Sequence, residues 1–117
     1  MNTIIPIEIY QTCIDLRLVK SVSRCMRGIM KKRGCKYNLK GESHGMVWKY
    51  DTDMYFLLYD INNMTHGLVS HEIEHIRAYI AEHAGSCEID STYLVQLITN
   101  KVYAFLEDNG VVVTSGM

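Results

Sequence analysis

Hydrophobic and polar residues follow two different periods along the chain, and the change of period marks the expected elements. The first ten residues are rich in isoleucine around Pro6, the only proline, which suits a short edge strand because an edge tolerates a missing N–H donor. From about residue 15 to residue 33, apolar residues recur every three or four positions. This spacing predicts an amphipathic helix that ends at Gly34.

The second part of the chain predicts a hairpin and two more helices. Segments 46–50 and 54–60 are aromatic and apolar and predict a β-hairpin with a three-residue connection. Helical spacing of apolar residues continues over about 65–83 and about 90–106, and the last seven residues suit a short strand or a frayed tail. The expected order is β, α, β, β, α, α, a single α+β domain with a small sheet over residues 1–117.

Composition narrows the possible function classes without naming one. The chain is 48% hydrophobic and 21% charged, which is typical of a globular domain and excludes a disordered tail or a fibre. Its net charge of −1 points to no class of partner. No apolar run reaches the roughly 18 residues that span a bilayer, and no basic segment precedes the apolar N-terminus as in a signal peptide. With four widely spaced cysteines and no CxxC, we expect a cytoplasmic protein with reduced thiols and no membrane partner.

The most informative motif is the HExxH pattern His71-Glu72-Ile73-Glu74-His75, inside the second predicted helix. Residues four apart share one helix face, so the imidazoles of His71 and His75 can converge on one Zn²⁺ at about 2.0–2.1 Å. Glu72 can reach a water on that ion and act as general base when the water attacks a carbonyl. The alternative is a pair of solvated histidines beside an ordinary glutamate.

A catalytic zinc needs a third protein ligand, and the motif supplies only two. The downstream glycine and histidine of metzincins are absent. Asp90 is the favoured candidate, because its helical phase matches the inward-facing residues of the third helix, and Glu88 is the second candidate. An N-cap role for Asp90 explains the same residue nearly as well. Cys87 is a weaker candidate, since a lone cysteine is more often part of a core.

The string GLVSHEIEHIRAYIAEHAG, followed by TYLVQLITNKVYAFL, resembles the small phage and prophage zinc-metallopeptidase-like proteins. The similarity covers most of the chain, including the N-terminal strand, the basic helix and the hairpin. It implies a minimal zincin-like domain with a gluzincin-like layout in a bacterial or phage-infected cell. It further implies that His71 and His75 bind zinc and that Glu72 is the catalytic base.

The resemblance also implies an acidic third ligand on the final helix, a few residues before the tyrosine. Here the matching position holds Ile89, between Glu88 and Asp90. The sequence therefore departs from the family pattern at this ligand, and Asp90 is retained as the predicted one.

Basic residues gather near the N-terminal end, where nine of the twelve Lys and Arg residues lie between positions 17 and 40. One interpretation is an anion-binding face for nucleic acid or an acidic protein. The favoured alternative is the solvated face of an amphipathic helix. No aromatic residue interleaves with these charges before Tyr37, which argues against single-strand binding by stacking. Five of the nine recur at helical spacing: Arg17, Lys20, Arg24, Arg27 and Lys31.

The leading hypothesis is a zinc-dependent peptidase that hydrolyses peptide or protein substrates in a cleft between the hairpin edge and the HExxH helix. Because so small a chain has little room for a deep specificity pocket, a homodimer or a partner protein is expected to complete the cleft. Nucleic acid is not an expected partner. The alternative is a catalytically inactive zincin-fold phage accessory protein whose basic helix binds an acidic partner or nucleic acid. A third hypothesis is a structural zinc site closed by a fourth protein ligand.

Overall fold

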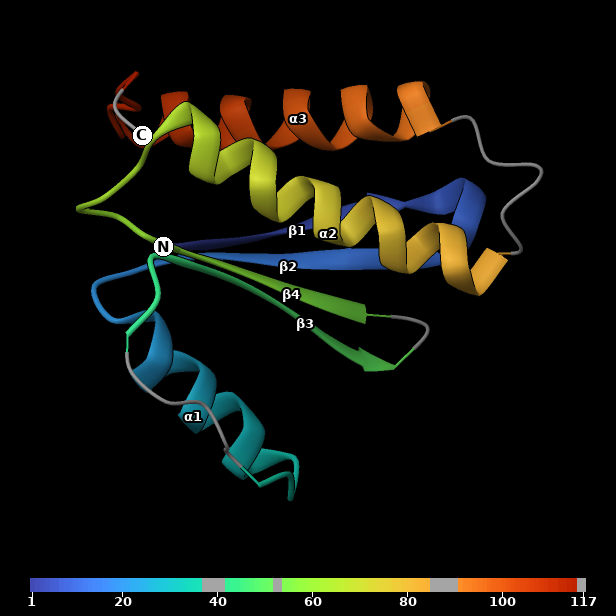
Figure 1. The fold of residues 1–117 in the computed structure, drawn as a ribbon, viewed down its shortest axis with the longest axis horizontal. Helices are drawn as coiled ribbons and strands as arrows, with labels where there is room; N and C mark the ends of the chain where they lie inside the picture. The colour runs from blue at the N-terminus through green and yellow to red at the C-terminus, as the bar shows by residue number, and fades with distance from the viewer. Residues whose placement is uncertain (37–41, 52–53, 85–90, 116–117) are drawn as a thin grey trace.

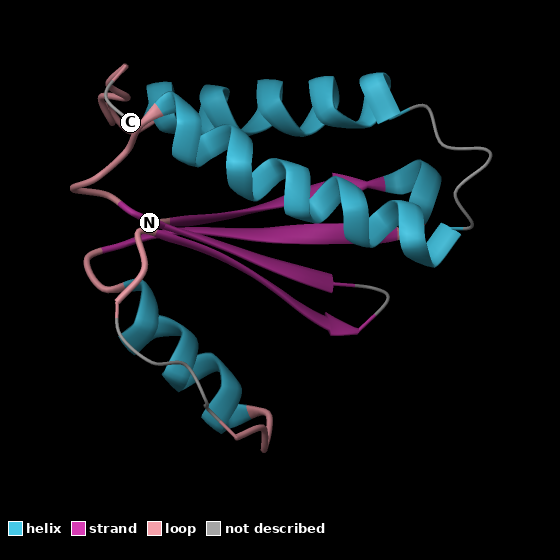
Figure 2. Cartoon of the chain, in the orientation of Figure 1, coloured by secondary structure: helices cyan, strands magenta, loops and turns pink. Residues whose placement is uncertain are grey.

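The fold is that of a computed structural model, which describes residues 1–36, 42–51, 54–84 and 91–115 (Figure 1). The domain is α+β, as predicted: helices α2 and α3 cover one face of a four-stranded sheet and helix α1 lies on the other (Figure 2). In chain order the elements are β1 (Asn2–Ile7), the 3₁₀ turn η1 (Glu8–Tyr10), β2 (Thr12–Val19), α1 (Val22–Lys32), β3 (Gly45–Asp51), β4 (Met54–Asp60), α2 (His66–Ala84) and α3 (Ser91–Asp108).

The sheet is mixed and has the strand order β1-β2-β4-β3. Strand β1 pairs with β2 and β3 pairs with β4 in antiparallel fashion, whereas β2 and β4 are parallel. Pro6 lies on β1, which is an edge strand, as its missing N–H predicts. The predicted hairpin is present as β3 and β4, and residues 52–53 of its connection lie outside the described residues. The other edge of the sheet is therefore β3.

The first helix is shorter than predicted, because the prediction of a helix from residue 15 is wrong. Residues Thr12–Val19 form the central strand β2, and α1 begins only at Val22. Buried Ile14, Leu16 and Leu18 recur at the period of two that is typical of a strand, and among the residues between them only Asp15 is also buried. Leu18 precedes Val22 by four residues, so helical spacing continues by coincidence across the boundary. The hydroxyl of Ser21 caps α1 by accepting a hydrogen bond from the backbone N–H of Arg24 at 3.3 Å.

The second and third helices match the prediction closely. Thr65 caps α2, since its hydroxyl accepts a hydrogen bond from the backbone N–H of Leu68 at 3.1 Å. Helix α3 runs two residues further than predicted and is followed by Gly110, whose φ of 67° is the left-handed conformation that favours glycine. Thr114 of the C-terminal tail forms a bridge with Thr65, which places this part of the tail against the start of α2. Gly85, the predicted end of α2, lies outside the described residues.

Two apolar clusters hold the layers together. The larger lies between the sheet and helices α2 and α3, and it includes Leu57 and Tyr59 of β4 and Ile73 of α2. The smaller lies under α1, where Met26 packs with Phe56. Burying one such side chain contributes about 1.5–3 kcal/mol, so the larger cluster fixes α2 firmly on the sheet. Within the described residues, no helix is both long and apolar enough to cross a bilayer.

Candidate metal centre

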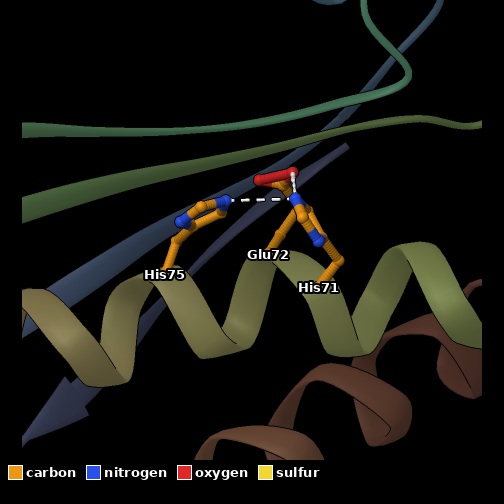
Figure 3. Close-up of side chains that lie close together, drawn as sticks. All are labelled: His71, Glu72 and His75. Carbon is orange, nitrogen blue, oxygen red and sulfur yellow. Dashed lines mark hydrogen bonds and ion pairs between the residues drawn. The ribbon is translucent and has the colours of Figure 1, made fainter.

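Helix α2 brings His71, Glu72 and His75 of the HExxH motif together on the side that faces the strands (Figure 3). The Nε2 atoms of His71 and His75 are 3.1 Å apart. Oε1 of Glu72 lies 4.0 Å from Nε2 of His71. One candidate ligand atom from each residue lies within 4.8 Å of the other two. The convergence expected from the helical spacing is therefore present.

The spacing of the two imidazoles fits a zinc ion. Two nitrogens at about 2.0–2.1 Å from Zn²⁺ and at the tetrahedral angle lie about 3.3–3.4 Å apart. The 3.1 Å between the two Nε2 atoms, which are hydrogen-bonded to each other here, is close to this value. The side chain of His71 is 66% exposed and His75 is exposed as well, which leaves the pair open to an ion from solvent. Donor type, spacing and access thus agree.

Glu72 lies in a different environment from the two histidines. It is only 6% exposed, and its carboxylate lies between α2 and the strands. Burial raises the pKa of its carboxyl group, and the opposing effect of the nearby His75 and His71 is smaller. A carboxylate with a raised pKa is a better proton acceptor near neutral pH, which is the property a general base needs.

Gly45, the first residue of β3, lets the strand approach Glu72 closely. A Cβ atom at this position would lie 2.9 Å from Cγ of Glu72 and 2.9 Å from Cδ1 of Leu68. No side chain fits there without displacing one of these two. Sequence reasoning missed Gly45 because the predicted strand began one residue later; a glycine inside a strand is a signal of close backbone approach.

A pocket of about 200 Å³ opens between β3 and α2 beside the motif. It lies where the leading hypothesis places the cleft, between the hairpin edge and the second helix. Because Tyr79 follows His75 by four residues, its place on the same helix face could have been predicted, whereas the contribution of β3 depends on the tertiary fold. The pocket is lined by Gly45, Met46, Val47, Glu72, His75 and Tyr79.

The part of the chain that the structure describes offers no candidate for a third ligand besides Glu72. No other His, Cys, Asp or Glu of that part joins the group. Helix α3 passes on the opposite side of α2 from the imidazoles (Figures 1 and 3), and from Thr92 onward its only acidic residues are Glu107 and Asp108 at its far end. The predicted ligand Asp90 and its alternative Glu88 lie outside the described residues.

The predicted basic helix is divided between two elements, which corrects the sequence interpretation. Arg17 belongs to strand β2, and Lys20 precedes α1. Only Arg24, Arg27 and Lys31 of the five spaced cations lie on α1. The cause is the same boundary error that extended the helix to residue 15.

Comparison with known proteins finds no family model, no curated protein and no solved structure that matches this chain. Inference about function therefore depends on the geometry of the residues themselves.

Proposed function

We propose that the protein is a small zinc-dependent peptidase with a minimal zincin-like domain. The observation that carries the proposal is the buried carboxylate of Glu72 beside two imidazoles whose Nε2 atoms are 3.1 Å apart. A zinc ion held by His71 and His75 would polarise the scissile carbonyl and lower the pKa of a water to about 7.

Glu72 is the proposed general base. Its carboxylate accepts a proton from the attacking water and later passes that proton to the leaving amine. The raised pKa of this carboxyl group suits both steps, because the group binds the proton more tightly than an exposed glutamate does. The close approach of Gly45 limits the conformations open to the side chain and so keeps the carboxylate near the imidazoles.

Strand β3 is the proposed binding site for the substrate backbone. It is an edge strand, so an extended peptide can add to it through main-chain hydrogen bonds. The neighbouring pocket of about 200 Å³, with Val47 and Tyr79 in its lining, offers space for one substrate side chain. A peptide or protein substrate is therefore the class that this arrangement suits, and a homodimer or partner protein would extend the cleft.

The proposed third ligand is Asp90, and Glu88 is the alternative. Separate replacement of each by alanine identifies the ligand, because only loss of the ligand lowers the zinc content of the purified protein. The proposed setting is the cytoplasm of a bacterial or phage-infected cell.

The test combines elemental analysis with hydrolysis of a peptide library. We expect Glu72→Gln to retain zinc but to lose activity by about 10²–10⁴-fold, which is the usual contribution of a general base. His71→Ala is expected to lose both zinc and activity. Glu74→Gln is the matched control, because this glutamate belongs to the same motif but is exposed and paired with Arg77 at 2.6 Å.

The proposal is wrong if Glu72→Gln hydrolyses peptides as fast as the parent protein does. It is equally wrong if the parent protein and His71→Ala contain the same amount of zinc. Loss of activity in Glu74→Gln would show that the measured effect is not specific to the buried carboxylate.

A further inference from the structure

A second pocket lies on the face of the sheet that α1 covers, away from the candidate metal centre. Its volume is about 300 Å³, at the lower end of the range for small-molecule sites. A Cβ atom on Gly28 would meet no atom within 4 Å, so the space beside this glycine is open. Three of the lining residues are cationic and none is acidic: the lining consists of Arg17, Cys25, Gly28, Ile29, Lys32 and Arg33.

The two arginines of this pocket are held over aromatic rings. Cζ of Arg33 lies 4.7 Å from the centroid of Phe56 and 5.0 Å from that of Tyr50. Cζ of Arg17 lies 5.5 Å from Phe56, and its Nε and Nη2 atoms each donate to the Asp15 carboxylate at 3.1 Å. Arg17 is thus already paired, and Nη1 of Arg33 donates to the carbonyl of Ile29 at 3.4 Å. A phosphate would meet the N–H groups that these bonds leave, on Nη1 of Arg17 and on Nε and Nη2 of Arg33.

An exposed aromatic ring borders the pocket. Tyr50 is 42% exposed, and its centroid is 5.4 Å from that of Trp48, two residues earlier on β3. Trp48 stacks in turn on Phe56 at 5.7 Å. In the sequence, no aromatic residue lies among the basic residues before Tyr37. The fold nevertheless brings Tyr50 of β3 next to Arg33. Cationic and aromatic groups are therefore adjacent on this face.

The charge distribution favours an anionic partner here. Residues 1–36 contain eight Lys and Arg residues and only two acidic residues, a net charge of +6 in a chain whose total is −1. Helix α1 itself carries no acidic residue, and Asp15 is paired with Arg17. The carboxylate of Glu42 accepts hydrogen bonds from Ser21 and Ser23 at the N-terminal end of α1, away from Lys32 and Arg33 at its C-terminal end. The potential over α1 and the adjoining pocket is therefore positive.

We propose that this face binds single-stranded nucleic acid, with a backbone phosphate between Arg17 and Arg33 and a base stacked on Tyr50. A cationic groove beside an exposed aromatic ring is the combination that binds single strands with little sequence preference. An acidic protein would engage the charges but would make no use of the aromatic ring. A duplex keeps its bases stacked inside and away from Tyr50. This inference does not depend on the proposed peptidase activity.

The test is fluorescence anisotropy of the full chain with a labelled 20-nucleotide oligo(dT) and with a duplex of the same length, at 50 and 200 mM salt. We expect the single strand to bind more tightly and its affinity to fall steeply with salt. Lys32→Gln and Arg33→Gln should each weaken binding and reduce the salt slope by about 1. Tyr50→Ala should weaken binding about fivefold or more, and Tyr50→Phe should retain it. Lys101→Gln on α3 removes the same charge elsewhere and should change nothing.

Three results would overturn this inference. The first is unchanged affinity in both Lys32→Gln and Tyr50→Ala. The second is binding of the duplex as tightly as the single strand, and the third is displacement of the oligonucleotide by polyglutamate at an equal concentration of charge, which indicates an acidic protein partner. Lys32 is exposed, so the Lys32→Gln result does not depend on a change in folding. Zinc content and hydrolysis should be unchanged in the same variant.

Discussion

Replacing Gly45 with alanine tests how tightly strand β3 packs against helix α2. The new Cβ atom would lie 2.9 Å from Cγ of Glu72, 2.9 Å from Cδ1 of Leu68 and 3.3 Å from Cδ of Glu72. Contacts this short force a movement of the glutamate, of the leucine or of the whole helix. Glu72 is buried, and the open space beside it is the neighbouring pocket that it lines.

Overpacking of this kind costs typically about 1–3 kcal/mol. The obstacles at Gly45 are two side chains and not backbone, so we expect the lower part of that range, about 1–2 kcal/mol. For a domain of about this size, each kcal/mol lowers Tm by roughly 4 °C, so the expected decrease is about 4–8 °C. Thermal unfolding followed by circular dichroism on the metal-free protein measures it.

Gly67→Ala is the matched control for this experiment. Gly67 lies on α2, and a Cβ atom there would meet nothing within 4 Å. Alanine should therefore stabilise the helix by up to about 1 kcal/mol. Gly45→Ala should also reduce hydrolysis more than zinc content, because it displaces Glu72 and not the imidazoles. A Tm at or above that of the parent protein would refute the packing argument.

Two further predictions concern stability. The pKa of Glu72 is raised in the folded state by burial, so the carboxylate destabilises the metal-free fold increasingly as pH rises above its unfolded value of about 4.3. Glu72→Gln should therefore be more stable than the parent protein at pH 7 but not at pH 3, as urea unfolding at both pH values would measure; an equal difference at both would contradict the assignment. The buried Oγ1 of Thr12 has no hydrogen-bond partner among the described residues. Thr12→Val should thus leave stability unchanged or raise it by up to about 1 kcal/mol, and a clear loss in the same assay would show that the hydroxyl has a partner.

The parts of the fold that the sequence predicts are those governed by one element alone. Helix α2 buries Val69, Ile73, Ile76 and Ile80, whose spacing of four, three and four residues is visible in the sequence. The separation of the two imidazoles is likewise a property of helical geometry. The motif could therefore be placed, and its histidines brought together, without knowledge of the sheet.

The parts that could not be predicted depend on neighbours distant in the sequence. The parallel pairing of strand β2 with β4 leaves no local signal, although the strand itself has one, because Ile14, Leu16 and Leu18 alternate with Asp15 and Arg17. Beside the first pocket, Gly45 of β3 lies against Glu72 of α2. Beside the cationic pocket, Arg33 lies over the ring of Tyr50. Each of these contacts joins residues from different elements.

Strand β3 contributes to both proposed sites, and the two sites lie on its opposite faces. Successive side chains of a strand point to opposite faces, so Val47 packs with the cluster under α2 while Trp48 packs with the cluster under α1. Substitution of Val47 should therefore affect peptide hydrolysis, whereas substitution of Tyr50, on the same side as Trp48, should affect nucleic-acid binding. Val47 and Tyr50 are close along one strand, so a loss of both functions in either variant would indicate disruption of β3 itself. Loss of one function in each variant would support two distinct sites.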